Sequence, residues 1–237
     1  MAGARKTVGG AVLAFALGAL MTGCASASPE GSGAVAGDAP IEQLDAAWLD
    51  SGRMVGIVTM GSSSCMPLAE VGPYTDGTLE VSLTDDPAAA CTRDLAPRVS
   101  VVALPVEVDP TQGLDVVVTG GAYDGIALLA PLDAGEVGEN EDLAPSAGWT
   151  GAEGQFAVLT WGSSSCAPVV DTAEVTGDTE ITVTFASAPS EQVCTMDMAP
   201  RANLVAVDAS GLGEGPVVAS FTGGEFVGTV VPILGER

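Results

Sequence analysis

One internal repeat constrains the fold of this chain more than any other feature of its sequence. The segment GSSSCMP at residues 61–67 returns as GSSSCAP at residues 162–168, with an offset of 101 residues. Residues 91–98 return at 194–201, and residues 119–123 return at 222–226, both with an offset of 103 residues. Because three blocks recur in one order at nearly one spacing, the chain contains two copies of a unit of about 80 to 95 residues, within the usual domain range.

The hydrophobic pattern within each copy predicts β-strands. Leu79, Val81 and Leu83 alternate with polar residues in the first copy, and the second copy shows the same alternation from residue 181 to residue 185. Such alternation is typical of strands with one buried face. Apolar runs rich in β-branched residues, which also favour strands, lie at residues 55–59, 99–104, 116–119, 156–161, 204–207 and 216–221.

These patterns together predict an all-β chain. We expect two tandem small β-sandwich or open-barrel modules, related by the repeat, with about five or six strands and one disulfide each. Asp76-Gly77 and Gly177-Asp178 are predicted turns before the alternating strands. One short helix is predicted at residues 41–49, and three tryptophans are predicted to lie in the core, namely Trp48, Trp149 and Trp161.

The cysteines of the two copies occupy equivalent places. Four cysteines allow three pairings, and only pairing within each copy gives both copies the same geometry. We therefore predict the disulfides Cys65–Cys91 and Cys166–Cys194, each of which stabilises a small domain by about 3 kcal/mol through loop closure. A redox-active role is the alternative, but these cysteines are not spaced as C-x-x-C and share no cationic neighbour.

The N-terminal segment has the layout of a bacterial secretory signal peptide. Arg5 and Lys6 precede an uncharged run at residues 8–21, and the run ends in the sequence LMTGC at residues 20–24. This ending resembles the lipobox of bacterial lipoproteins, with Met21 in the place of the usual leucine. The resemblance implies that Cys24 carries a diacylglycerol thioether and becomes the first residue after cleavage, so that the protein is lipid-anchored on the extracytoplasmic face of the cell membrane.

Two alternatives to the lipoprotein interpretation are a secreted protein without lipid and a membrane-spanning anchor. The run at residues 8–21 spans about 21 Å as a helix, whereas a bilayer core is about 30 Å thick. The predicted organisation is therefore a signal peptide (1–23), a flexible tether rich in Ala, Ser, Gly and Pro (24–40), module 1 (41–132), an acidic linker (133–146) and module 2 (147–237).

The charge and composition exclude several functions. The chain has 7 Lys and Arg against 31 Asp and Glu, and removal of residues 1–23 leaves five arginines and a formal charge of −26. We expect no nucleic-acid partner, because phosphate binding needs clustered cationic residues. The chain has no histidine, and its single lysine, Lys6, lies in the signal segment. Histidine-dependent triads and lysine nucleophiles are thereby excluded, and we expect no catalytic residue, cofactor or metal.

The repeated blocks supply the candidate binding residues. If each copy forms its disulfide, the GSSSC loop and the Cys-Thr-x-Asp-x-x-Pro-Arg block come together, and their polar side chains are expected to line one pocket per copy. A structural role in turns is the alternative for all of them. The candidates are Ser63, Ser64, Thr92, Asp94 and Arg98 in the first copy, and Ser164, Ser165, Thr195, Asp197 and Arg201 in the second. Calcium binding by the acidic linker is a further alternative, although the linker lacks the order of ligands of a calcium loop.

The tandem GSSSC and Cys-Thr-x-Asp-x-x-Pro blocks resemble those of a tandem-repeat lipoprotein family of high-GC Gram-positive bacteria. The resemblance implies a location and no activity. We expect a non-catalytic binding or structural module of the cell envelope, whose partner is an envelope protein or glycan. The alternative is a carboxylate-dependent hydrolase of envelope glycan, which needs two acidic groups in one cleft. Only Asp94 and Asp197 recur within a motif, and each copy supplies one of them.

Overall fold

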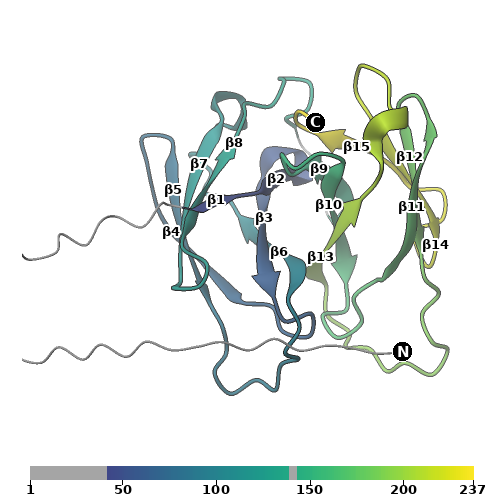
Figure 1. The fold of residues 1–237 in the computed structure, drawn as a ribbon, viewed down its shortest axis with the longest axis horizontal. Coiled ribbons are helices and arrows are strands. Elements are labelled where there is room, and N and C mark those ends of the chain that lie inside the picture. Colours follow the sequence, from purple (N-terminus) through teal and green to yellow (C-terminus); the bar gives the residue numbers. More distant parts are fainter. Residues whose placement is uncertain (1–41, 139–142) are drawn as a thin grey trace, which may run out of the picture. The chain divides into compact units, whose positions relative to one another are not determined.

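The computed structural model describes residues 42–138 and 143–237, which form an all-β structure (Figure 1). Its regular elements in these two ranges are fifteen strands and three short 3₁₀ turns, with no α-helix. All of these described residues belong to one compact unit. The predicted signal peptide, the tether and Cys24 lie outside the described residues.

The first half of the structure, residues 42–138, contains eight strands and two 3₁₀ turns. The turns are Asp50–Gly52 and Pro110–Gln112. The strands are β1 (Glu42–Leu44), β2 (Ala46–Leu49), β3 (Met54–Gly61), β4 (Leu68–Thr75), β5 (Thr78–Thr84), β6 (Ala96–Ala103), β7 (Leu114–Thr119) and β8 (Gly125–Leu129). They form a five-stranded sheet in the order β1-β8-β7-β5-β4 and a three-stranded sheet in the order β2-β3-β6.

The second half, residues 143–237, contains seven strands in one sheet and one 3₁₀ turn, Ala209–Gly211. The strand order in this sheet is β11-β12-β14-β15-β9-β10-β13. The strands are β9 (Ser146–Trp149), β10 (Gln155–Gly162), β11 (Val170–Gly177), β12 (Glu180–Phe185), β13 (Ala199–Ala206), β14 (Val218–Gly223) and β15 (Val230–Leu234).

The strand pairings of the two halves correspond one to one. Strands β3 and β6 pair antiparallel, as do β10 and β13. Strand β5 pairs with β4 antiparallel and with β7 parallel, and β12 pairs in the same two ways with β11 and β14. The difference lies at the first strand, because β9 pairs with both β10 and β15, whereas β1 and β2 divide these two pairings between them.

The alternation in the sequence determines which faces are buried. Leu79, Val81 and Leu83 are at most 1% exposed, and Ile181, Val183 and Phe185 are at most 2% exposed. Each half thus has its own apolar core, which in the first half lies between the five-stranded and three-stranded sheets. The predicted turn at Asp76-Gly77 is also present, since both residues adopt the positive φ angles that a tight hairpin between β4 and β5 requires.

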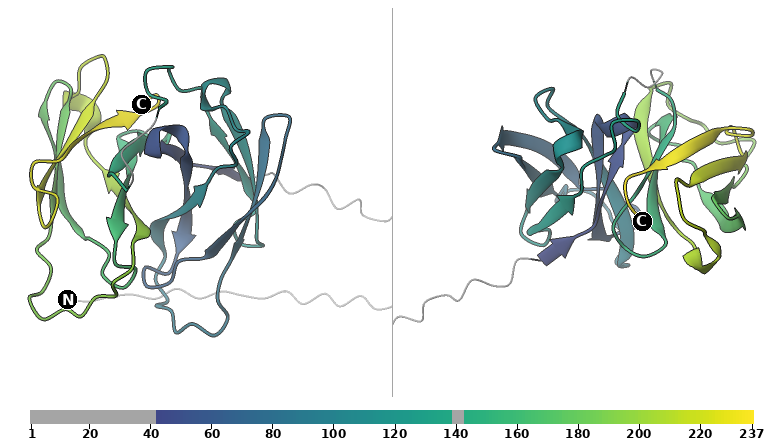
Figure 2. Two further views of the ribbon diagram at one scale, coloured as in Figure 1. Left: turned by 180° about the vertical axis from the view of Figure 1, so that it is seen from behind. Right: turned by 90° about the horizontal axis from the view of Figure 1, so that it is seen from above.

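A third apolar cluster joins the two halves. It contains Leu49 and Val99 from the first half and Leu159 from the second, all at most 5% exposed. Strands β6 and β13 lie against each other, as do β2 and β9. The C-terminal strand β15 also reaches the junction, because Leu234 packs in the core of the first half, and the C-terminus lies between the halves in both further views (Figure 2).

The backbones of β2 and β9 run antiparallel in close contact at this junction. The Ala46 amide donates to the Thr150 carbonyl at 3.1 Å, and the Asp50 amide donates to the Ser146 hydroxyl at 2.9 Å. The Trp48 carbonyl lies over Gly148, where a β-carbon would overlap it. The two halves are therefore joined by backbone contacts as well as by side-chain packing.

The prediction of a helix at residues 41–49 was wrong. Residues 42–44 and 46–49 form β1 and β2, and all four residues of β2 are buried. A strand that is covered on both faces carries apolar residues at successive positions, and in so short a segment this pattern cannot be distinguished from that of a buried helix.

In the predicted linker, strand β9 already begins at Ser146, and the Glu136 carboxylate accepts a hydrogen bond from the Gly235 amide at 3.0 Å. Residues 139–142 of that linker lie outside the described residues.

Candidate functional site

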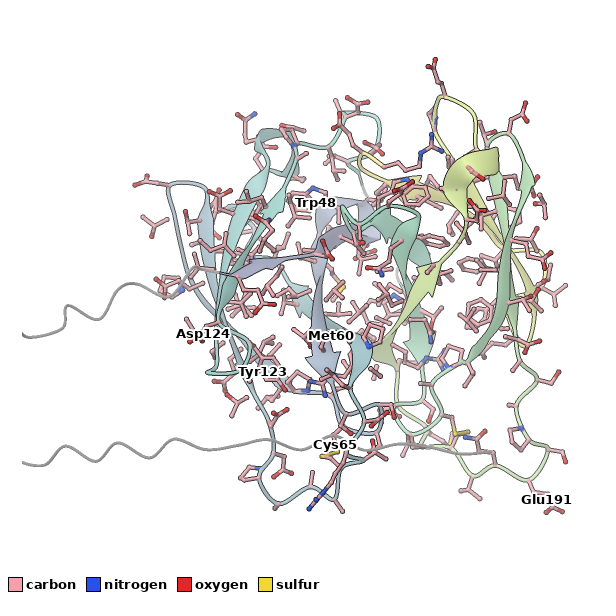
Figure 3. The ribbon with its side chains drawn as sticks, viewed as in Figure 1. Trp48, Met60, Cys65, Tyr123, Asp124 and Glu191 are labelled. Atoms are coloured by element: carbon pink, nitrogen blue, oxygen red, sulfur yellow. A yellow bond between two sulfur atoms is a disulfide. The ribbon has the colours of Figure 1, made fainter. Side chains whose placement is uncertain are left out.

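Each half contains one disulfide at the same place. Cys65–Cys91 and Cys166–Cys194 both join the loop after the first long strand to the loop before β6 or β13, with Cα–Cα distances of 5.6 Å. These are the two pairings that the repeat predicts. Cys65 lies at the same end of the molecule as Glu191, which belongs to the loop before Cys194, and Trp48 lies toward the other end (Figure 3).

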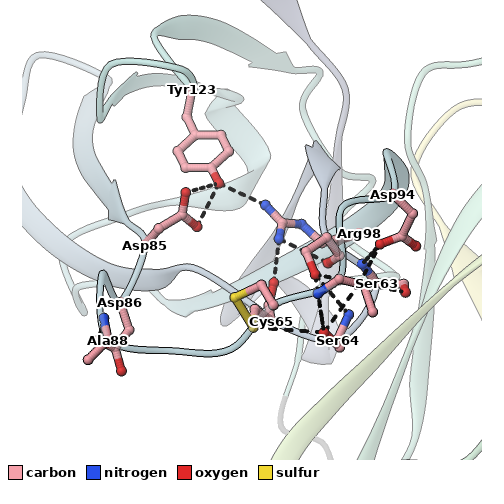
Figure 4. The surroundings of a disulfide bond; sticks show 12 residues. Ser63, Ser64, Cys65, Asp85, Asp86, Ala88, Asp94, Arg98 and Tyr123 are labelled. Carbon is pink, nitrogen blue, oxygen red and sulfur yellow. Dashed lines mark hydrogen bonds between the residues drawn. A yellow bond between two sulfur atoms is a disulfide. The ribbon is translucent and has the colours of Figure 1, made fainter.

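A cluster of hydroxyl groups lies beside the first disulfide on the surface (Figure 4). The Thr92 hydroxyl lies 2.8 Å from the Ser62 hydroxyl and 3.3 Å from the Ser64 hydroxyl. It donates a short hydrogen bond to the Asp94 carboxylate, which also accepts the Ser63 amide at 3.2 Å. We call Ser62, Ser63, Ser64, Thr92 and Asp94 the first hydroxyl cluster.

The second half repeats this cluster almost atom for atom. The Thr195 hydroxyl lies 2.8 Å from the Ser163 hydroxyl and donates to the Asp197 carboxylate. The Ser164 amide donates to the same carboxylate at 3.1 Å. We call Ser163, Ser164, Ser165, Thr195 and Asp197 the second hydroxyl cluster. Because the polar groups of each cluster bond to one another, both clusters hold their loops together.

A buried arginine lies beneath each hydroxyl cluster. Arg98 is 5% exposed and Arg201 is 7% exposed. Their guanidinium groups donate to main-chain carbonyls of the cysteine loops, including the Cys65 carbonyl and, at 3.0 Å, the Cys166 carbonyl. The guanidinium of Arg201 lies flat against Gly162, where a β-carbon would approach it to 2.7 Å. Each arginine therefore bonds the backbone that its disulfide also fixes.

The two halves neutralise this buried charge in different ways. In the first half Arg98 donates to the Tyr123 hydroxyl at 2.9 Å, and that hydroxyl donates to the Asp85 carboxylate at 2.7 Å. Burial, together with the Asp85 carboxylate, raises the pKa of the Tyr123 hydroxyl. The second half has Phe226 in place of Tyr123, and Arg201 instead forms an ion pair with Glu225 at 3.0 Å. Glu225 occupies the position of Ala122, so the side chain that contacts the arginine stands one residue earlier in the second half than in the first.

The aspartates of the two clusters have lowered pKa values. Hydrogen bonds from the Ser63 and Thr92 side chains and from the Ser63 amide lower the pKa of Asp94 to about 2. Hydrogen bonds from the Thr195 and Ser164 side chains and from the Ser164 amide lower the pKa of Asp197 to about 2 in the same way. Donors stabilise the ionised form of a carboxyl group, so both carboxylates stay charged at neutral pH.

These pKa values predict how the clusters depend on pH. The folded pKa of about 2 lies below the ordinary value of 3.8, so the ionised aspartates stabilise the fold above pH 3.8 and lose this contribution as the pH falls through about 2. We expect Asp94→Asn with Asp197→Asn to lower the melting temperature at pH 7, and the difference from the unchanged chain to disappear near pH 2. Thermal unfolding followed by circular dichroism measures both values, with Asp171→Asn on β11 as the control for charge. A difference that persists undiminished at pH 2 would contradict the assignment.

A pocket of about 740 Å³ lies beside the second disulfide. Its wall contains Phe185 and Phe226 as well as Val169, and its polar side chains include the paired Arg201 and Glu225. Arg201 is the only one of the ten predicted binding residues that lines this pocket. Of the other nine residues, Arg98 is buried beneath the first hydroxyl cluster, and eight belong to the two surface clusters.

Several residues that complete the site are not predicted from the sequence. Arg98 donates to the Tyr123 hydroxyl, which in turn donates to the Asp85 carboxylate, and Arg201 pairs with Glu225. Within a repeated block, Ala122-Tyr123 of the first copy is replaced by Glu225-Phe226 in the second, and this difference is visible in the sequence. Only the fold shows that Tyr123 and Glu225 contact the buried arginines. Trp48 and Trp149 are core residues at 3% and 5% exposure, as predicted, whereas Trp161 is half-buried at the junction.

Residues 42–138 and 143–237 contain no group of three or more histidine, cysteine, aspartate or glutamate side chains placed to hold a metal ion. Within the same ranges no helix is long and apolar enough to cross a bilayer. Comparison of the chain with protein families, curated proteins and solved structures finds no match.

Proposed function

We propose that this chain is a lipid-anchored protein of the extracytoplasmic membrane face, which acts there as a non-catalytic binding module. In this proposal residues 1–23 are removed, Cys24 carries the lipid, and the tether positions the compact unit away from the membrane. The unit consists of two open-barrel modules related by the repeat. Its partner is a component of the cell envelope, either a protein or a glycan.

The state of the repeated aspartates carries the proposal. A glycan hydrolase needs a carboxylic acid with a raised pKa that can donate a proton, next to a second carboxylate. Asp94 and Asp197 are exposed, their pKa values are lowered to about 2, and their hydrogen-bond partners are loop groups of their own clusters. These properties favour a structural carboxylate that shapes a recognition surface over a general acid.

The placement of the two hydroxyl clusters also supports binding. Strands β6 and β13, which begin directly after the two clusters, lie against each other. Cys65 of the first cysteine loop and Glu191 of the loop before Cys194 lie at one end of the compact unit (Figure 3). Two similar surfaces at one end suit a partner that repeats, because the second contact becomes intramolecular after the first has formed.

Mass spectrometry of the native N-terminus tests the anchor. We expect the first residue to be a lipid-modified Cys24, and Cys24→Ala to move the protein from the membrane fraction into the medium. An unmodified Cys24, or a chain that retains residues 1–23, would overturn this part of the proposal.

Incubation with purified envelope glycan tests the binding activity. We expect sedimentation of the protein with the glycan or with an envelope protein fraction, no release of soluble sugar, and weaker sedimentation of the Asp94→Asn, Asp197→Asn double variant. Asp171→Asn serves as the control for the loss of charge. Release of sugar that the double variant abolishes would establish the hydrolase instead.

A further inference from the structure

The pocket beside the second disulfide arises from a difference between the repeats. At four lining positions the second half carries a smaller side chain than the first half, whereas Phe185 and Glu225 stand where the first half has Leu83 and Ala122. Ala167, Ala186, Ser187 and Ala188 occupy the positions of Met66, Thr84, Asp85 and Asp86. The four smaller side chains lie around one space of about 740 Å³ beside the second disulfide.

The volume and the wall of this pocket suit a small molecule. Ligand pockets usually measure about 300 to 1,000 Å³ and have mostly apolar walls with few polar groups. Phe185 and Phe226 lie at a ring-centroid distance of 4.8 Å within the same wall, and they are 2% and 8% exposed. Packing within a core cluster fixes both rings, so the wall is preformed.

The accessible charge in the pocket is negative. The Arg201 side chain is 6% exposed, and its guanidinium already donates to the Trp161 and Cys166 carbonyls. The Glu225 side chain is 65% exposed and contacts Arg201 through one of its two carboxylate oxygens. A ligand therefore meets the carboxylate of Glu225, while the arginine stays beneath it.

Charge complementarity then selects the ligand. The whole chain carries a formal charge of −24, which attracts cations and repels anions at long range. Aromatic rings beside a carboxylate favour an ammonium group, because the ring faces and the carboxylate both carry negative electrostatic potential. Resting on the proposed binding function, we propose that this pocket binds small molecules with an apolar body and one ammonium group, and that the ammonium group pairs with Glu225.

Three phenylalkyl probes with different polar groups test the proposal, namely 4-phenylbutylamine, 4-phenylbutanol and 4-phenylbutyrate. The full chain with Cys24→Ala is used, so that no lipid competes for the probes. We expect amide NMR shifts at Ala186, Ser187 and Phe226, with the amine binding about fivefold more tightly than the alcohol, the gain of one solvent-accessible ion pair. Tighter binding of the butyrate, or shifts located elsewhere, would overturn the proposal.

Two variants separate the charge from the space. Glu225→Gln should weaken the binding of the amine about fivefold and leave the binding of the alcohol unchanged. Ala167→Met restores the larger residue of the first half and should abolish the binding of both probes, whereas Met66→Ala at the equivalent position of the first half should leave it unchanged. An unaltered NMR spectrum outside the pocket establishes that each variant is folded. Amine binding that survives Ala167→Met would overturn the proposal.

The envelope experiment distinguishes this inference from the proposed function. If the chain sediments with envelope material but its pocket binds none of the three probes, the pocket inference fails and the binding function stands. If the pocket binds the amine while no envelope component is retained, the inference stands and the envelope function fails.

Discussion

Gly148→Ala should destabilise the whole compact unit by about 3 kcal/mol or more, although it adds one methyl group. The new β-carbon would overlap the carbonyl oxygen of Trp48. That oxygen belongs to the backbone of β2, which is buried and paired with β3, so it cannot move aside as the end of a side chain can. Relief requires β2 and β9 to separate, and the hydrogen bond from the Ala46 amide to the Thr150 carbonyl would then be lost.

Denaturant unfolding of the purified variant measures this loss. Gly135→Ala is the matched control, because a β-carbon at Gly135 would meet no atom within 4 Å, and we expect it to change the free energy of unfolding by no more than about 0.5 kcal/mol. Equal stability of Gly148→Ala and Gly135→Ala would show that β2 and β9 are not packed together as described.

The sequence alone predicts the all-β class, because the period-two pattern appears wherever a strand has one wet face and one buried face. Strand β5 shows this pattern, with Glu80 and Ser82 more exposed than the neighbouring Leu79 and Val81. Neither copy by itself predicts the junction, because the contact between β2 and β9 joins segments about 100 residues apart. The same contact explains why a helix was wrongly predicted at residues 41–49. The second half covers β2, so both faces of this strand are buried and its sequence lacks the alternation of a strand with one exposed face.

The candidate site shows a similar division. The repeat predicts that the serine loop, the threonine, the aspartate and the arginine of each copy come together, and the structure places them around each disulfide. The repeat does not predict that the arginines are buried, since arginine is seldom fully buried without a partner. The partners differ between the halves, with Tyr123 in one and Glu225 in the other. The repeat therefore predicts the residues that both copies share, but it does not predict the partners of the arginines, which differ between the copies.

Removal of either disulfide should lower the free energy of unfolding by about 3 kcal/mol. The two loops have similar lengths, with sequence separations of 26 and 28 residues, so Cys65→Ala with Cys91→Ala and Cys166→Ala with Cys194→Ala should have similar effects. Each disulfide also fixes the loop whose carbonyl accepts a hydrogen bond from the buried arginine. Loss of the disulfide therefore loosens the position of the guanidinium as well as the loop.

The shape of the unfolding curve tests how the halves depend on each other. The third apolar cluster and the placement of Leu234 in the core of the first half make each half incomplete without the other, so we expect one cooperative transition that either double variant shifts as a whole. Differential scanning calorimetry measures this, after peptide mapping without reductant has established both pairings in the unchanged chain. Two transitions, of which each double variant shifts only one, would mean that the modules fold independently. In that case the contact between β2 and β9 would contribute little to stability, and Gly148→Ala would lose its effect as well.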